Sequence, residues 1–373
     1  MLTALPRLEP GDTVGIFGGG QLGRMLAMAC AKLGLRAAIF APEPHSAAFS
    51  VATSHVCASY DDAAAVEAFA TRCHVLTFEF ESIPVETLLR AATITPVLPD
   101  PRAVAIAQNR IREKRFLTDA GLPVAPHCAV ADETALPQAA QHLETWPYGG
   151  ILKRAAYGYD GKGQARVETA ADLERAFREW RTECVLEQRV EFLAEVSVIA
   201  VRDGAGRLSA YDVPRNTHEG GILRRSEVPC GVASEVRDEA AALASKIADA
   251  LDYVGVLAVE LFVLGENAGA SKRLLVNEIA PRVHNSGHWT LEACVISQFE
   301  NHVRAVAGWP IGSTARHSDA VMLNLLGAEA AGWRGVLADD ASASLHLYGK
   351  HGMQDGRKLG HVTRITPRSN LED

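Results

Sequence analysis

The glycine-rich segment that follows Lys153 has residue types suited to holding nucleotide phosphates. Residues 157–164 read Tyr-Gly-Tyr-Asp-Gly-Lys-Gly-Gln. Glycines let backbone N–H groups approach an anion, and Lys162 adds a positive charge between two of them. An ordinary hairpin turn is the competing interpretation, because Asp-Gly is a common turn dipeptide and lysine is a usual solvated tip residue. Other charged residues of the chain must therefore decide between the two.

Two glutamates stand within apolar, strand-like runs. Glu260 lies in the run 256–263, and Glu278 occupies a matching place in 274–280. Burying a carboxylate there without a partner would be costly, so we expect a cation nearby. On adjacent strands the two side chains would offer oxygen ligands to Mg²⁺. A structural ion pair from either glutamate to an arginine is the alternative.

The segment directly after these strands, 281–290, is dense in hydrogen-bond donors: Pro-Arg-Val-His-Asn-Ser-Gly-His-Trp-Thr. The planar fork of Arg282 suits a small oxyanion, and His284 and Asn285 add hydrogen bonds. A capped loop before a helix at 291–306 is the alternative, and it explains the hydroxyl residues but not the whole cluster.

A second glycine turn lies near the N-terminus. Residues 18–23 read Gly-Gly-Gly-Gln-Leu-Gly, after an expected strand and at the start of an expected helix, which fits a dinucleotide site. Such a site also needs an acidic residue ending the second strand, but 37–42 ends in alanine and proline. NAD is therefore disfavoured. The turn presents its N–H groups to a substrate phosphate or sugar, or is only a tight connection.

Two further carboxylates end another expected parallel strand, where ligands gather in open α/β sheets. Alternation directs Glu79 and Glu81 to the same side, so we expect one or both to face a substrate. Two solvated carboxylates on a loop are the alternative.

Composition excludes several classes of protein. A chain of 373 residues with 48% apolar content suggests two or three domains, and a net charge of −8 without a basic block argues against nucleic acid. The seven cysteines lie at least 16 residues apart, so neither a zinc motif nor a disulfide framework is indicated and reduced thiols in a cytoplasm are expected. We expect neither a signal peptide nor a membrane span.

The order of expected elements predicts an N-terminal parallel α/β domain, a small central lid and a C-terminal mixed α+β domain. In the first part, strands at 13–17, 37–40 and 75–78 alternate with helices at 22–33 and 66–73, and a helix at 103–120 follows a proline-rich stretch. The lid has strands at 150–154, 164–168 and 184–188 and a helix at 171–181; the last part has strands at 194–202, 255–264 and 272–279 and a helix at 235–251. The expected domains are 1–103, 104–190 and 191–373.

Several motifs together carry a family resemblance. They are GGGQLGRM at 18–25, GYDGKGQ at 158–164, EQ and EVS within 187–197, NEIAPRVHNSGHWT at 277–290 followed by SQFE, and GRKLGH at 356–361. With them the chain resembles the ATP-grasp superfamily and, within it, the N5-carboxyaminoimidazole ribonucleotide synthetase family of purine biosynthesis. The resemblance implies a three-domain ATP-grasp fold in which ATP lies between the lid and the C-terminal domain.

The resemblance also implies roles for individual residues. Mg²⁺ would bind Glu260 and Glu278, and bicarbonate would bind Arg282 and His284. The aminoimidazole nucleotide would contact Lys350, Arg357 and Lys358, with Gln21, Glu79, Tyr159, Asn285 and Ser286 as weaker candidates. ATP would contact the following residues: Arg110, Lys153, Gly158, Tyr159, Asp160, Gly161, Lys162, Gly163, Gln164, Glu187, Gln188, Arg189, Val190, Glu195, His218, Asn277 and Glu278.

The implied activity is the carboxylation of 5-aminoimidazole ribonucleotide with ATP and bicarbonate, through carboxyphosphate, in a cytoplasmic homodimer. Three rivals differ in class: another ATP-grasp ligase such as the formate-dependent glycinamide ribonucleotide transformylase, an NAD-dependent oxidoreductase, and a nucleotide-binding regulator without turnover. Two departures from the superfamily pattern are visible. Ala280 replaces an amide that often follows the second metal carboxylate, and the chain ends at Asp373 where relatives usually continue, so we expect a different C-terminal rim.

Overall fold

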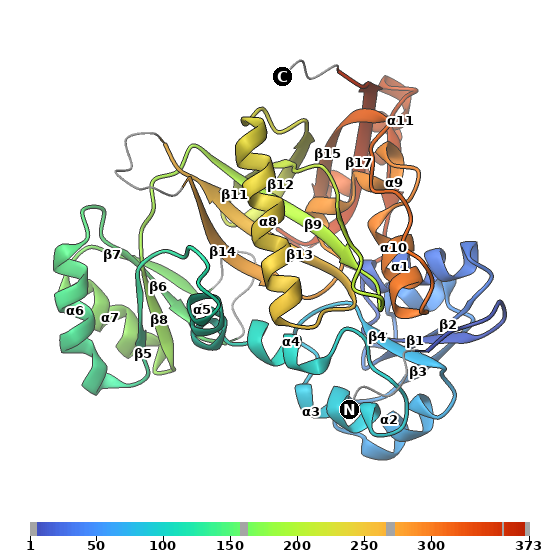
Figure 1. Ribbon diagram of the computed structural model, residues 1–373, viewed down its shortest axis with the longest axis horizontal. Helices are drawn as coiled ribbons and strands as arrows, with labels where there is room; N and C mark the ends of the chain where they lie inside the picture. The colour runs from blue at the N-terminus through green and yellow to red at the C-terminus, as the bar shows by residue number, and fades with distance from the viewer. Residues whose placement is uncertain (1–5, 157–162, 266–272, 353, 370–373) are drawn as a thin grey trace.

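Three β-sheets, formed by three consecutive parts of the chain, organise the described residues (Figure 1). The computed structural model describes residues 6–156, 163–265, 273–352 and 354–369. None of the helices in these ranges is long and apolar enough to cross a membrane. The expected division at residues 103 and 190 stays a prediction.

The N-terminal sheet is parallel, as predicted, with the order β3-β2-β1-β4. Aromatic and aliphatic side chains from its strands and from α2 and α3 form one core on this sheet. Its elements are β1 (Thr13–Phe17), α1 (Gln21–Lys32), β2 (Arg36–Ala41), the 3₁₀ helix η1 (Ala47–Val51), β3 (Ser54–Cys57), α2 (Ala63–Ala70), β4 (Val75–Phe78) and α3 (Val85–Ala92).

The central sheet is antiparallel, with the order β5-β8-β6-β7, and it carries α6 and α7 (Figure 1). Leucines of both helices pack on its strands in a separate small core. The linking helices are α4 (Pro101–Ala107) and α5 (Arg110–Asp119). The sheet and its helices are β5 (His127–Val130), η2 (Glu133–Ala135), α6 (Leu136–Thr145), β6 (Gly150–Arg154), β7 (Gln164–Val167), α7 (Ala170–Trp180) and β8 (Cys184–Gln188).

The C-terminal sheet has nine strands, eight of them in the order β14-β13-β9-β11-β12-β15-β17-β16, with β10 paired to β9. Helix α8 packs on one face, while α10 on the other face brings in α1 and so joins the N-terminal part. The elements are β9 (Ala194–Arg202), β10 (Leu208–Ala210), β11 (Arg215–Glu219), β12 (Ile222–Val228), α8 (Ser234–Ala250), β13 (Gly255–Val263), β14 (Leu274–Ala280), η4 (Asn285–Gly287), α9 (Thr290–Ala293), α10 (Gln298–Val306), β15 (Ser318–Leu326), η5 (Gly327–Gly332), α11 (Trp333–Asp339), β16 (Ser344–Leu347) and β17 (Lys358–Pro367).

Two helices predicted as continuous are broken, and polar caps explain both breaks. The predicted helix 103–120 stops at Gln108, because Asn109 is extended and its side-chain oxygen accepts hydrogen bonds from the N–H groups of Ile111 at 3.0 Å and Arg112 at 3.1 Å. The predicted helix 291–306 is likewise interrupted before Ser297, which caps α10. Residues that bond to the nearby backbone compete with a continuing helix, which the hydrophobic pattern alone does not reveal.

Removing the cap of α5 should destabilise the protein measurably. We expect Asn109→Ala to lower the free energy of unfolding by about 1 kcal/mol, because two N–H groups lose their acceptor. Asn109→Ser, which keeps a capping oxygen, should recover most of the loss. Urea unfolding followed by circular dichroism measures both, and equal losses in the two variants would show that capping is not the cause.

Candidate active site

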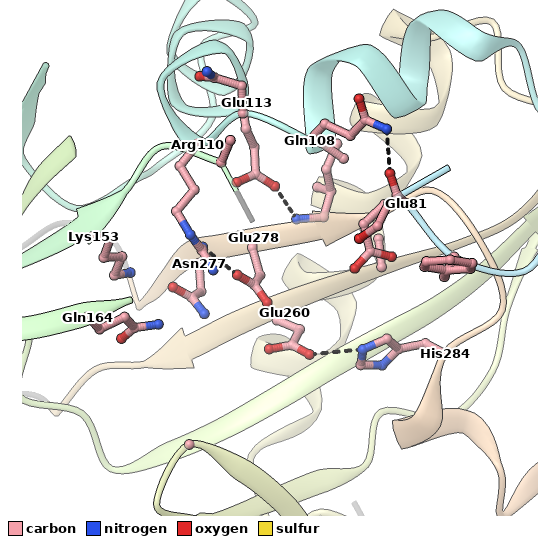
Figure 2. A pocket seen from close by; sticks show the side chains of 18 of the residues that line it. Glu81, Gln108, Arg110, Glu113, Lys153, Gln164, Glu260, Asn277, Glu278 and His284 are labelled. Atoms are coloured by element: carbon pink, nitrogen blue, oxygen red, sulfur yellow. Dashed lines mark hydrogen bonds and ion pairs between the residues drawn. The ribbon is translucent and has the colours of Figure 1, made fainter. Parts of the chain in front are cut away.

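A cavity of about 960 Å³ lies where the three parts of the chain meet, and charged side chains from all of them line it (Figure 2). The predicted residues that it brings together are Gln21, Glu79, Arg110, Lys153, Gln164, Glu187, Gln188, Arg189, Val190, Glu195, His218, Glu260, Asn277, Glu278, Arg282, His284, Asn285 and Lys358. The predicted contacts Gly158, Tyr159, Asp160, Gly161 and Lys162 lie outside the described residues.

Glu260 and Glu278 face each other at the centre of the cavity, as their matching positions in the sequence predicted. The pairing of β13 with β14 places them directly opposite. Side chains directly opposite on one sheet face are close neighbours, so the two carboxylates repel. Burial and then the Glu278 carboxylate raise the pKa of Glu260. Such a half-buried pair suits a divalent cation, because the cation would offset the repulsion between the two negative charges.

Positive or polar groups flank this carboxylate pair on both sides. Arg110 Nη1 donates to Glu278 Oε2 at 2.7 Å, and His284 Nε2 lies 3.2 Å from Glu260 Oε1. Burial acts to raise the pKa of Glu278, but Arg110 and then Lys153 act against it and leave the pKa below its ordinary value. The alternative interpretation, an ion pair between one of these glutamates and an arginine, is therefore present at Glu278. It lies beside the predicted metal site and does not replace it.

A second ion-pair group lies next to the first, and the sequence analysis missed half of it. Lys153 Nζ lies 3.0 Å from Glu187 Oε1, and Lys114 Nζ lies 3.2 Å from Glu187 Oε2. Lys114 Nζ also donates to the carbonyl of Asn277 at 2.8 Å. Burial acts to raise the pKa of Glu187, but Lys153 and then Lys114 lower it to about 2. Glu113 is also buried, and it accepts from the N–H of Ile279 at 2.7 Å.

A helical pattern was the available signal for these missed residues. Arg110, Glu113 and Lys114 are spaced three and four apart, so one face of α5 carries all three toward the cavity. The missed break at Asn109 hid where this face begins. Gln108, just before the break, donates to the carbonyls of Glu81 and Ile83 at 2.6 and 2.5 Å.

Glu79 and Glu81 are neither solvated nor equivalent. Glu79 is buried and accepts from the N–H groups of Gly20 and, at 2.7 Å, Gly23. A carboxylate of the same protein therefore already binds two N–H groups of this turn. The expected contact of the turn with a substrate phosphate or sugar stays a prediction. Gly18 has a positive φ of 103° and a side chain there would collide with Glu79, which explains the glycine as a packing requirement.

The second of these carboxylates, Glu81, holds the arginine predicted to bind the oxyanion. Arg282 donates through Nε to Glu81 and through Nη1 to the carbonyl of Val283 at 3.0 Å. Its neighbour His284 is neutral, because burial and then Arg282 lower its pKa well below the ordinary value. On the far side of the cavity, His218 bonds through Nδ1 to Glu195.

Four predicted residues that the structure describes do not line the cavity: Gly163, Ser286, Lys350 and Arg357. Ser286 is buried behind His284 and bonds to its ring at 2.8 Å. Lys350 donates to the carbonyl of Lys358 at 3.2 Å, and its charge acts on the carboxyl of Glu79. Arg357 donates to the carbonyl of His351. The predicted contacts of Ser286, Lys350 and Arg357 with the aminoimidazole nucleotide, and of Gly163 with ATP, stay predictions.

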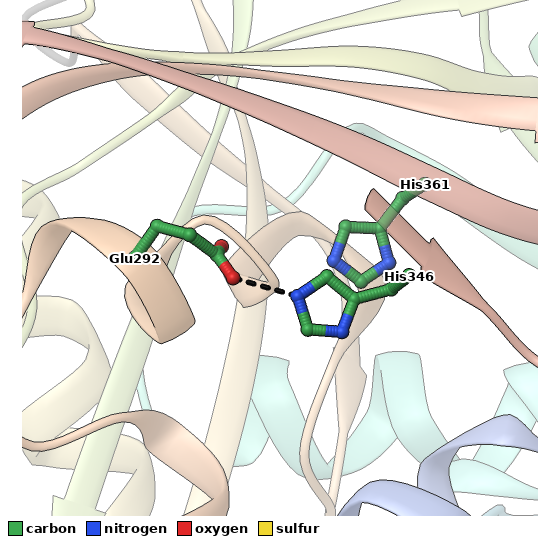
Figure 3. A group of neighbouring side chains, drawn as sticks. All are labelled: Glu292, His346 and His361. Atoms are coloured by element: carbon green, nitrogen blue, oxygen red, sulfur yellow. Dashed lines mark hydrogen bonds and ion pairs between the residues drawn. The ribbon is translucent and has the colours of Figure 1, made fainter. Parts of the chain in front are cut away.

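A group of metal-type side chains lies outside this cavity, between α9 and the strands β16 and β17 (Figure 3). Glu292 Oε1 lies 2.6 Å from His346 Nε2, and Tyr348 bonds to His361 Nδ1 at 2.7 Å. The rings of His346 and His361 stack at 4.4 Å with only 6° between their planes. The lone pair of an imidazole nitrogen lies in the plane of its ring, and two nearly parallel planes do not meet at one ion, so we assign this group to packing.

Comparisons with known proteins agree with this geometry. The ATP-grasp domain family matches residues 115–299, the ribonucleotide synthetase preATP-grasp domain matches 12–108, and the phosphoribosylaminoimidazole carboxylase C-terminal domain matches 320–371. The N5-carboxyaminoimidazole ribonucleotide synthase of Brucella melitensis is 47% identical over 365 residues, covering 97% of this chain and 98% of the relative. The chain belongs to the N5-carboxyaminoimidazole ribonucleotide synthase family.

Solved structures of N5-carboxyaminoimidazole ribonucleotide synthases share the fold. An ADP complex of one such synthetase has a TM-score of 0.91 and 38% identity, covering 97% of this chain and 94% of that one. The Aspergillus clavatus enzyme in complex with ADP and 5-aminoimidazole ribonucleotide has a TM-score of 0.88 and 30% identity, covering 96% and 94%. The predicted family, the ATP-grasp fold with its three parts and the predicted enzyme class, an ATP-dependent ligase, are confirmed.

The buried Glu187 carboxylate should make stability depend on pH in a defined window. Its pKa is lowered from 4.5 to about 2, so its stabilisation is fully present above pH 4.5 and is lost as the pH falls toward 2. We expect Glu187→Gln to lower the free energy of unfolding by about 3 kcal/mol at pH 7, from the size of that shift.

Unfolding of the wild type and the variant across pH checks this expectation. The gap between them should narrow as the pH falls below 4.5. The matched control is Glu168→Gln, which removes an exposed carboxylate paired with Arg166 and should leave stability almost unchanged. A gap that stays constant with pH would contradict the assignment.

Proposed function

We propose that this protein carboxylates the exocyclic amine of 5-aminoimidazole ribonucleotide, using ATP and bicarbonate and releasing ADP and phosphate. The observation that carries the proposal is the half-buried pair Glu260 and Glu278 in the cavity, bordered by Arg110 on one side and by His284 and Arg282 on the other. One flank suits the phosphates of a nucleotide and the other suits a small oxyanion. The family of this chain performs this reaction by name, and the comparisons do not favour the formate-dependent alternative.

Mg²⁺ fits this pair. The carboxylates of Glu260 and Glu278 lie directly opposite each other, and burial and then Glu278 raise the pKa of Glu260. A divalent cation that prefers oxygen ligands would offset their repulsion. Glu260 and Glu278 would hold it, and Ala280 gives the metal no further ligand from that position. When bound, the metal supplies charge neutralisation for phosphate oxygens.

ATP is held by residues from the central and C-terminal parts. Lys153 and Arg110 are the cations for its phosphates, and Glu187 to Val190 line the part of the cavity assigned to adenine. Glu195, bonded to His218, is placed for the ribose hydroxyls. Phe192 and Phe262, which the sequence analysis did not single out, stack at 4.7 Å and add an apolar wall to the same cavity.

Bicarbonate binds between Arg282 and His284. With Glu81 fixing one edge of the guanidinium, the arginine keeps a defined orientation toward the anion. A bicarbonate oxygen attacks the γ-phosphorus, the bond from that phosphorus to the β,γ-bridging oxygen breaks, and ADP leaves, so carboxyphosphate forms. Lys153 and Arg110 offset charge on the phosphoryl group during transfer.

The amine of 5-aminoimidazole ribonucleotide then forms a bond to the carboxyl carbon, directly or after release of CO₂. The C–O bond to the phosphate breaks, the amine loses a proton, and the products are the carbamate and inorganic phosphate. Lys350, Arg357 and Lys358 lie on one stretch of the C-terminal part and supply the cationic contacts for the nucleotide phosphate. Gln21 and Asn285, which line the cavity, assist binding of the same substrate, and Ser286 assists it through its bond to His284. We propose a cytoplasmic homodimer on the family resemblance.

Substrate dependence tests the proposal directly. We expect ADP formation from ATP, Mg²⁺ and bicarbonate to rise strongly on addition of 5-aminoimidazole ribonucleotide, because the amine removes the intermediate and completes the cycle. Coupled measurement of ADP release gives the result. Formate with glycinamide ribonucleotide is the control, and a response to that pair but not to bicarbonate would overturn the proposal.

The carboxylate pair should be indispensable for turnover. We expect Glu278→Gln to lower kcat by roughly 10² or more, because an amide removes one charge from the predicted metal site. The matched control is Glu292→Gln, a partly buried carboxylate outside the cavity. Thermal unfolding verifies that both variants fold, and a Glu278→Gln enzyme with nearly normal kcat would remove Glu278 from the mechanism.

A further inference from the structure

A row of side-chain hydrogen bonds crosses the C-terminal sheet and ends at His284. Ser226 Oγ donates to Asn216 Oδ1 at 2.8 Å, and Asn216 Nδ2 donates to Ser197 Oγ at 3.0 Å. The hydroxyls of Ser197 and Ser286 lie 2.7 Å apart, and Ser286 Oγ lies 2.8 Å from His284 Nδ1. All four supporting side chains are buried. Neither the sequence motifs nor the proposed mechanism gives Ser197, Asn216 or Ser226 a role.

Strand register explains how the row forms. Ser226 on β12 lies opposite Asn216 on β11, and Ser197 on β9 lies opposite Glu260 on β13. Residues directly opposite in an antiparallel pair point to the same face of the sheet. The face that carries Glu260 therefore also carries this row, while Val198, next to Ser197, packs on the other face with α8.

The direction of the hydrogen bonds is fixed at the histidine end. The backbone N–H of Ser286 donates to His284 Nδ1 at 3.3 Å, so this nitrogen carries no proton. In a neutral imidazole the proton must then be on Nε2. The Ser286 hydroxyl also donates to Nδ1, which leaves its oxygen to accept from Ser197, whose own oxygen accepts from the Asn216 amide.

The opposite direction of these hydrogen bonds is excluded at His284 Nδ1. Turning the Asn216 amide around would reverse each donor along the row and require a proton on His284 Nδ1. That proton would oppose the backbone N–H of Ser286, which cannot act as an acceptor. The backbone of the loop and the side chains of the sheet therefore select the same tautomer.

We propose that Ser197 and Asn216 are positioning residues that hold His284 in its Nε2–H tautomer through Ser286. This tautomer directs an N–H donor toward Glu260 and the cavity, where a bicarbonate oxygen accepts it. The inference rests on the proposed function for the identity of the anion, but the tautomer itself does not. With the other tautomer, His284 would present a lone pair to an anion and to a carboxylate, and both contacts would be repulsive.

The experiment reads the tautomer without relying on activity. The full-length protein is labelled with ¹⁵N-histidine, and long-range ¹H–¹⁵N correlation spectra distinguish a protonated from an unprotonated ring nitrogen. The chain has 13 histidines, and the His284 signals are those missing from His284→Gln. We expect one tautomer, Nε2–H, in the wild type.

Three variants then test the row. Ser197→Ala removes the hydroxyl that donates to Ser286, and we expect both tautomers of His284 to be populated. Ser197→Thr retains the hydroxyl and should restore the single tautomer. Asn216→Asp removes the donor to Ser197 at nearly constant shape, and it should act like Ser197→Ala. If Ser197→Ala does not fold, Ser197→Cys, with a weak donor of similar size, replaces it.

Steady-state kinetics complete the test. We expect kcat of Ser197→Ala to fall roughly two- to tenfold, in proportion to the fraction of the competent tautomer, with the KM for ATP unchanged. A pure Nε2–H tautomer in Ser197→Ala and Asn216→Asp would overturn the inference, whatever the kinetics. Mixed tautomers with a normal kcat would uphold the inference and instead contradict the proposed contact of His284 with bicarbonate.

Discussion

The register between β13 and β14 is the constraint on which the site depends, because it sets the carboxylates of Glu260 and Glu278 against each other in a half-buried part of the cavity. Two ionised carboxylates that face each other cost free energy, and removal from water increases that cost. Positive or donor groups from other segments of the chain stabilise the pair: Arg110 contacts Glu278, and His284 contacts Glu260. A one-residue slip of either strand would send one carboxylate to the opposite face and leave its partners unpaired.

The same logic extends outward from this pair. Each charged group beside it is held by a group of opposite sign: Glu187 by Lys114 and Lys153, and Arg282 by Glu81. These pairs link elements from different parts of the chain, since Glu81 follows β4, Arg110 begins α5, and Glu187 lies in β8. Buried ion pairs contribute little net stability, but removing one partner is costly. They therefore define how the three parts fit around the cavity.

Much of the fold followed from the sequence because local patterns coincide with the elements. The strands at 13–17, 150–154, 184–188 and 194–202 were predicted to the residue, since apolar runs bounded by glycine and polar residues leave little choice. The breaks at Asn109 and before Ser297 were not predicted, because a single capping side chain overrides an otherwise helical pattern.

The residues of the site also divide into those that the sequence predicted and those that it did not. Glu260 and Glu278 were accessible to sequence reasoning because a charge inside an apolar strand is conspicuous. Lys114 and Ser197 were not, because a lysine on a helix or a serine in a strand is common, and only tertiary contacts show that each is buried and bonded. The bonds of the Gly20 and Gly23 N–H groups to Glu79 were not predicted for a related reason: the acceptor lies 56 to 59 residues away in the chain.

The central claim is that this cavity transfers the γ-phosphoryl group of ATP to an oxygen of bicarbonate. Isotope transfer from ¹⁸O-labelled bicarbonate to inorganic phosphate tests it most directly, with 5-aminoimidazole ribonucleotide present and mass spectrometry of the phosphate as the readout. The attacking oxygen stays on phosphorus when the C–O bond breaks, so the account predicts one ¹⁸O atom in each phosphate formed. Unlabelled phosphate, produced in step with ADP and with product, would contradict it.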